Sequence, residues 1–215
     1  MRVKNHKDRY SFAARNSMFV NSLVSLSAIT SIILFFYIPH SSQIMIVISG
    51  MISIGYILPL VFRKRLRDIG RAKIVMISIV WALLPILSNI APGQLTINSL
   101  IFLEHFAFIF ALTIPFDIRD QRRDRRAKVS NLANQLGFSK LQIIFHLFTA
   151  GMIICALVLY VIGVYTFFVL IGITALAGIM WIANYPLEKV RREWYYLFFL
   201  DGLIGVKGLI YLLIL

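Results

Sequence analysis

Residues 97–126 read I-N-S-L-I-F-L-E-H-F-A-F-I-F-A-L-T-I-P-F-D-I-R-D-Q-R-R-D-R-R. The first part, Ile97–Phe116, is mostly apolar, and the second part, from Asp117 onward, interleaves aspartates with arginines. An α-helix needs about 20 predominantly apolar residues to cross the hydrocarbon core of a membrane. This stretch therefore predicts a membrane-spanning helix that ends in a charged segment at the membrane surface.

The composition of the whole chain extends this prediction to the other residues. Of its 215 residues, 60% are hydrophobic and only 14% are charged, whereas a soluble domain is closer to half apolar. So few charges exclude intrinsic disorder, and a soluble fold of this length could not bury so much apolar surface. The only cysteine is Cys155, which excludes an internal disulfide and a cysteine-based metal cage. We expect an all-α membrane protein, because the apolar runs lack the alternation of barrel strands.

Seven segments are long and apolar enough to be spans. The run from Leu141 to Ala183 carries no formal charge, and as one helix it would be about 65 Å long, twice the bilayer core. Gly163 near its middle is the expected turn. Pro59 and Pro85 fall inside spans and are expected to kink them. The predicted spans are Met18–Ile38, Ile44–Phe62, Ile74–Ala91, Ile97–Phe116, Leu141–Ile162, Val164–Ala183 and Tyr195–Leu215.

The cations predict the orientation of these spans. The chain has 22 Lys and Arg against 9 Asp and Glu, a net charge of +13. Every cation except Lys207 lies in the tail 1–17 or in the connections after the second, fourth and sixth spans, including the Asp/Arg-rich loop 117–140. Because cytoplasmic loops are rich in Lys and Arg, the amino terminus is expected inside and the carboxyl terminus outside. The prediction is one multi-pass domain, 1–215, in a cytoplasmic (inner) membrane. No nucleic acid partner is expected, because the cations lie in loops between spans.

Three carboxylates in the charged segment have helical spacing. At 100° per residue, Asp120 and Asp124 lie about −60° and −20° from Asp117, so a continuing helix would project all three from one face. Carboxylates clustered in this way suit Mg²⁺, which completes its shell with water and phosphate oxygens. The interleaved arginines suit phosphate, which arginine binds bidentately. The spacing indicates a site for Mg²⁺ and a diphosphate; the alternative is a solvated loop in which acids offset arginines.

These residues resemble a known family, the UbiA-type intramembrane prenyltransferases. The family's second aspartate motif is similar to D-I-R-D-Q-R-R-D at 117–124, with basic residues at 125–128 and Leu136-Gly137 following. The segment Tyr56–Lys73 is similar to the family's tyrosine and basic segment one loop upstream, and the last helix carries Asp201-Gly202 as some members do. The resemblance implies a UbiA-like helical bundle.

The chain also departs from the family pattern. The family has nine helices and a first motif of the type N-D-x-x-D, whereas about seven helices are expected here and that motif is absent. Aligning the aspartate motif makes the first two family helices the missing ones. An incorrectly assigned start, a divergent member with a degenerate first site, and an inactive relative all account for this difference.

The resemblance implies a Mg²⁺-dependent transfer of an isoprenyl group. The donor would be a polyprenyl diphosphate, and the acceptor a lipophilic molecule such as an aromatic quinone precursor, both bound within the lipid bilayer. Asp117, Asp120 and Asp124 would be the catalytic metal ligands. Tyr56 would face the reactive centre, with a packing role as its alternative. The diphosphate contacts would be Arg67, Lys73, Arg119 and Arg123.

Other functions fit parts of the pattern. A non-catalytic member of the same fold, acting as a scaffold, subunit or lipid-binding protein, would explain the missing first motif. A small transporter is less well supported because no duplicated half is visible, and the motif of CDP-alcohol phosphotransferases is absent. Glu104 and Lys207 lie at membrane depth, where charge is expensive. A structural pair or a snorkelling chain is the simpler explanation for both, while Asp201 could also reach the mouth of the site.

Overall fold

The described part of the chain is helical throughout. The computed structural model describes residues 14–57, 70–88, 94–126 and 131–212, and these ranges contain no strand. Four of their helices are long and apolar enough to cross a membrane, and Ser42–Gly55 and Ala72–Ile86 are shorter apolar stretches. The all-α membrane class is therefore confirmed. The four long helices are α2 (Ser17–Phe35), α5 (Leu95–Arg126), α7 (Phe138–Val161) and α8 (Phe167–Asn184).

The chain forms two compact units, of which the first is residues 1–43. It holds α2, which has no buried residue, and the beginning of α3 (His40–Ile57). Gln43 closes the turn between these helices, because its side-chain amide donates to the carbonyl oxygens of Phe35 at 3.0 Å and Ile38 at 3.3 Å.

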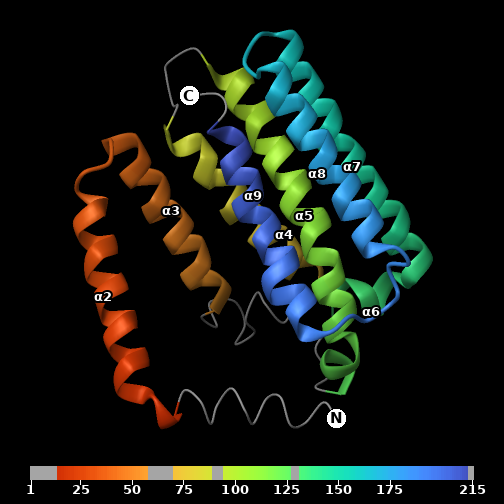
Figure 1. Ribbon diagram of the computed structural model, residues 1–215, viewed down its shortest axis with the longest axis horizontal. Coiled ribbons are helices and arrows are strands. Elements are labelled where there is room, and N and C mark those ends of the chain that lie inside the picture. The colour runs from red at the N-terminus through yellow and green to blue at the C-terminus, as the bar shows by residue number, and fades with distance from the viewer. Residues whose placement is uncertain (1–13, 58–69, 89–93, 127–130, 213–215) are drawn as a thin grey trace. The chain divides into compact units, whose positions relative to one another are not determined.

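The second unit, residues 44–215, is organised around α5. Helix α5 packs against α4 (Gly70–Leu83), against the short α6 (Leu132–Leu136) and against α7. In turn α7 packs against α8, and α8 against α9 (Asp201–Tyr211), so that α5, α7, α8 and α9 run side by side (Figure 1). A π-helical segment, η3 (Tyr195–Leu200), leads directly into α9.

Proline and glycine fix two of the boundaries. Helix α4 gives way to the 3-10 segment η2 (Leu84–Ser88) at Pro85, because proline has no N–H and its ring clashes with the preceding turn. This agrees with the predicted interruption, whereas Pro59 lies outside the described residues. Gly163 has a φ of 77° between α7 and α8, a conformation that glycine adopts without steric cost. The predicted turn is confirmed.

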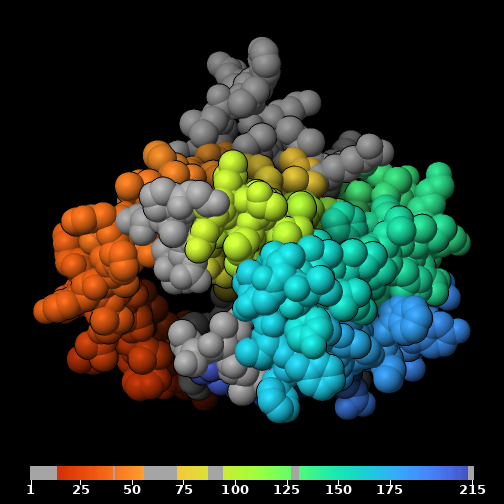
Figure 2. All heavy atoms as spheres, turned by 90° about the horizontal axis from the view of Figure 1, so that it is seen from above, coloured from red at the N-terminus to blue at the C-terminus, as the bar shows by residue number. Residues whose placement is uncertain are grey.

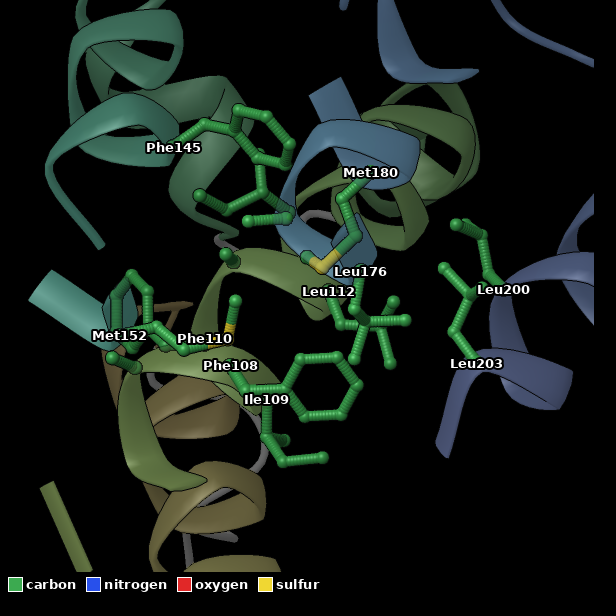
Figure 3. Close-up of a cluster of buried hydrophobic side chains, with 14 of the residues drawn as sticks. Phe108, Ile109, Phe110, Leu112, Phe145, Met152, Leu176, Met180, Leu200 and Leu203 are labelled. Atoms are coloured by element: carbon green, nitrogen blue, oxygen red, sulfur yellow. The ribbon is translucent and has the colours of Figure 1, made fainter. Parts of the chain in front are cut away.

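The apolar core joins α5, α7, α8 and α9. Leu112 of α5 lies near Leu176 and Met180 of α8 (Figure 3). Leu200 of η3 and Leu203 of α9 belong to the same core. In a space-filling view the beginning of α5 lies against the turn between α7 and α8 (Figure 2). This packing holds α5 over most of its length and determines where its charged end lies.

Candidate functional site

The three predicted acids lie on a helical extension of α5. This helix runs without a break from Leu95 to Arg126, which is about 48 Å against a hydrocarbon core of about 30 Å. The helix therefore continues past Phe116, as the common face of the aspartates requires. We call residues 117–126 the inner end of α5. The side chains of Asp117, Asp120 and Asp124 are 1%, 12% and 14% exposed, so all three face protein rather than bulk solvent.

Asp117 is the most buried of the three acids and has two strong partners. The ammonium of Lys73 on α4 lies 3.0 Å from its Oδ1. The backbone N–H of Leu132, at the start of α6, donates to its Oδ2 at 2.9 Å. An ionised carboxylate is costly to bury unless it is paired and hydrogen-bonded. These two partners offset that cost and join α4, α5 and α6 at one point.

Asp124 is held by Asn131, the residue that caps the start of α6. The side-chain amide of Asn131 donates to Asp124 Oδ2 at 3.0 Å and to the carbonyl oxygen of Asp117 at 3.3 Å. The side-chain oxygen of Asn131 accepts from the N–H of Asn134 at 2.7 Å, which caps α6. Gln121 adds a bond from its amide to the carbonyl oxygen of Ala133 at 3.0 Å. Helix α6 is thereby attached along the inner end of α5.

Asp120 is paired with two arginines. Arg119 Nε lies 3.0 Å from its Oδ1, and a terminal nitrogen of Arg123 lies 3.0 Å from its Oδ2. The guanidinium of Arg119 also lies over the rings of Phe116, at 5.2 Å, and Tyr196, at 4.8 Å. Cation–π contacts of this kind hold an arginine in one orientation. Asp201, at the start of α9, interacts electrostatically with the same arginine.

The structure brings six of the eight predicted site residues to the inner end of α5. Lys73 lies at Asp117, while Arg119 and Arg123 lie at Asp120. Arg67 and the side chain of Tyr56 lie outside the part of the chain that the structure describes. Sequence reasoning assigned no role to Asn131, although its place after the basic stretch, opening a short helix, is typical of a cap.

The acids suit Mg²⁺ in chemistry, but their present partners are protein groups. The amide of Asn131 joins the carboxylate of Asp124 to the backbone carbonyl of Asp117. Hard oxygen donors on one helix face are what Mg²⁺ takes. Among the residues that the structure places, no three acidic, histidine or cysteine side chains already converge on one point. Each acid instead contacts a cation or an amide of the protein.

The model of the UbiA prenyltransferase family matches residues 4–202, which include the whole inner end of α5. No curated protein and no solved structure matches the chain.

Proposed function

We propose, because the chain belongs to the UbiA prenyltransferase family, that it transfers an isoprenyl group from a polyprenyl diphosphate to a lipophilic acceptor. The carbon–oxygen bond between the isoprenyl chain and the diphosphate breaks, and its electron pair leaves with the diphosphate. The acceptor forms a bond to that carbon and releases a proton. An aromatic quinone precursor is an acceptor of suitable chemistry, because its ring is electron-rich.

The observation that supports this proposal is the paired charge at the inner end of α5. Three carboxylates there face three cations, Lys73, Arg119 and Arg123, each within 3.0 Å of an acid. We assign Asp117, Asp120 and Asp124 to hold Mg²⁺ and the three cations to bind the diphosphate oxygens. When bound, Mg²⁺ would neutralise charge that develops on the leaving diphosphate.

The three cations of the site are held in different ways, and we assign a different role to each. Arg119 is held between Phe116 and Tyr196 and presents a fixed planar donor set, which matches phosphate bidentately. Arg123 is 65% exposed and has the freedom to capture a diphosphate that arrives from solvent. Lys73 comes from another helix, so it joins α4 to the bound diphosphate.

A second candidate is a non-catalytic member of the family. It is favoured by the same ion pairs, because every acid of the site already has a protein partner. In that case the pairs would serve only to attach α4 and α6 to α5, and neither Mg²⁺ nor a diphosphate would bind.

Turnover of the purified full chain in lipid nanodiscs separates the two candidates. Radiolabelled isoprenyl diphosphates of increasing length are supplied with Mg²⁺ and a panel of lipophilic aromatic acceptors. We expect Asp120→Asn to lower turnover by at least about 100-fold, as loss of one transition-state contact does. The matched control is Glu188→Gln, which removes an exposed carboxylate far along the chain. Binding of inorganic diphosphate with Mg²⁺, measured by calorimetry, is expected in the parent and weakened in Asp120→Asn.

The outcomes of this experiment are distinct. Equal turnover in the parent and Asp120→Asn would remove this acid from the mechanism. A parent that binds no diphosphate and transfers no isoprenyl group, while remaining folded, would favour the non-catalytic candidate.

A further inference from the structure

A second group of buried polar side chains lies away from the inner end of α5. We call it the Glu104 cluster; its residues come from α5, from the turn before α8 and from α9. Glu104 is fully buried and Lys207 is 3% exposed, although both lie within predicted spans. Charge at this depth is costly without a partner. The members of the cluster are Glu104, His105, Tyr165, Lys207 and Tyr211.

Both oxygens of Glu104 are occupied by cluster members. The ammonium of Lys207 lies 3.0 Å from Oε1. The hydroxyl of Tyr211 donates to Oε2 at 2.5 Å and accepts from the hydroxyl of Tyr165 at 3.0 Å. His105 Nδ1 lies 2.9 Å from Oε2. The cluster therefore pairs one full negative charge with one full positive charge.

Aromatic rings hold the two α9 members of the cluster in place. The ammonium of Lys207 lies 4.2 Å from the centre of the Phe108 ring. The ring of Tyr211 stacks on that of His105 with 4.9 Å between centres. The backbone of α9 packs against α8, and these two long side chains add polar contacts from α9 to α5.

The Glu104 cluster is too distant to take part in chemistry at the aspartates. About 20 Å of helix separate Glu104 from Asp117 at 1.5 Å per residue. However, α9 continues directly from η3, and η3 carries Tyr196 beneath the guanidinium of Arg119. The helix that begins at Tyr195 therefore touches α5 at two levels, through Tyr196 and through Lys207.

We propose that Glu104 and Lys207 are a positioning pair for the candidate site. Their ion pair fixes the rotation and register of α9 on α5. That register keeps Tyr196 beneath Arg119 and thereby keeps Arg119 directed at Asp120. The consequence for diphosphate binding rests on the proposed function, whereas the consequence for helix position does not.

The position of α9 can be measured without any substrate. Nitroxide labels at Leu147→Cys on α7 and Leu209→Cys on α9, both 64% exposed, report the distance between these helices in nanodiscs by pulsed electron paramagnetic resonance. A Cys155→Ser background avoids a third label. The informative variant is Glu104→Gln/Lys207→Met, which removes both charges and so leaves no unpaired buried ion.

We expect this double variant to melt within a few degrees of the parent and yet to show a broadened distance distribution. Its KM for the diphosphate is expected to rise about tenfold while kcat changes less. The matched control, Lys189→Met, removes an exposed lysine and should leave every readout unchanged. A parental distance distribution in the double variant would overturn the proposal.

A second variant keeps the test decisive if the double variant does not fold. Glu104→Asp retains both charges and withdraws the carboxylate by one methylene group, so α9 must move to keep the pair. A shifted mean distance is expected, and an unchanged one would overturn the proposal. A chain that transfers no isoprenyl group but shows these distance changes would refute the proposed function alone.

Discussion

Replacing Lys73 by methionine tests how the Asp117 carboxylate is kept charged inside the protein. Methionine is also unbranched and is only one heavy atom shorter, so most of the packing is preserved while the ammonium is lost. The carboxylate, 1% exposed, then keeps only the N–H of Leu132 as a strong donor.

The structure sets the size of the expected effect. Removing one member of a buried ion pair costs about 3–5 kcal/mol. Lys73 is itself 25% exposed, so solvent screens part of the attraction, and we expect the lower value of about 3 kcal/mol. For a unit of this size that lowers the melting temperature by about 6–12 °C.

The measurement is thermal unfolding of the purified chain in detergent, followed by tryptophan fluorescence. Lys73→Met/Asp117→Asn should recover most of the loss, because no charge is then left unpaired. Lys140→Met, at an exposed lysine, is the matched control. The reasoning is refuted if Lys73→Met melts within about 2 °C of the parent, or if the double variant is no more stable than Lys73→Met.

Three further expectations concern the cap, the stacked arginine and the orientation. Asn131→Ala removes the cap of α6 and both bonds to the inner end of α5; thermal unfolding should show a loss of about 1–3 kcal/mol, and a parental melting curve would contradict the role of the amide. Arg119→Lys keeps the charge but loses the planar donor set, so KM for the diphosphate should rise about tenfold; an unchanged KM would remove this arginine from the diphosphate site. In intact cells of a cysteine-free background, a membrane-impermeant thiol reagent should label Ile162→Cys but not Ser139→Cys, because the cations predict that the second faces the cytoplasm; the reverse pattern would invert the predicted topology.

Much of the fold follows from the sequence because a membrane restricts the choice of structure. A long uncharged run must be helical and must turn where it exceeds the bilayer, and this places the turn at Gly163. The helix bounds are less predictable from composition. The span predicted over Ile74–Ala91 is a shorter α-helix followed by 3-10 structure, because Pro85 interrupts its hydrogen bonds. The last predicted span begins as a π-helix, which its apolar composition does not reveal.

The candidate site was predictable as a set of acids but not as a set of pairs. Helical spacing places Asp117, Asp120 and Asp124 on one face of a helix. Asp120 pairs with Arg119 and Arg123 of the same helix. Asp117 and Asp124 have partners from outside α5, Lys73 on α4 and Asn131 before α6, and local spacing contains no information on such tertiary neighbours.

The partners within the Glu104 cluster could not be predicted from local sequence either. Glu104 and Lys207 were each expected to be structural groups with a partner or a route to the membrane surface. The structure makes them partners of each other, across more than one hundred residues of sequence.

The inner end of α5 shows how a protruding helix can be kept from fraying. Pro115 lies just before it inside the helix and deprives the preceding turn of one backbone hydrogen bond, and helix ends beyond a bundle usually unwind most easily. The amide of Asn131 spans two turns, from the carbonyl of Asp117 to the carboxylate of Asp124. Unwinding by even one residue would lengthen that span and break both bonds. The helical pitch at this end, and with it the angle between the carboxylates, therefore depends on Asn131 as well as on α5 itself.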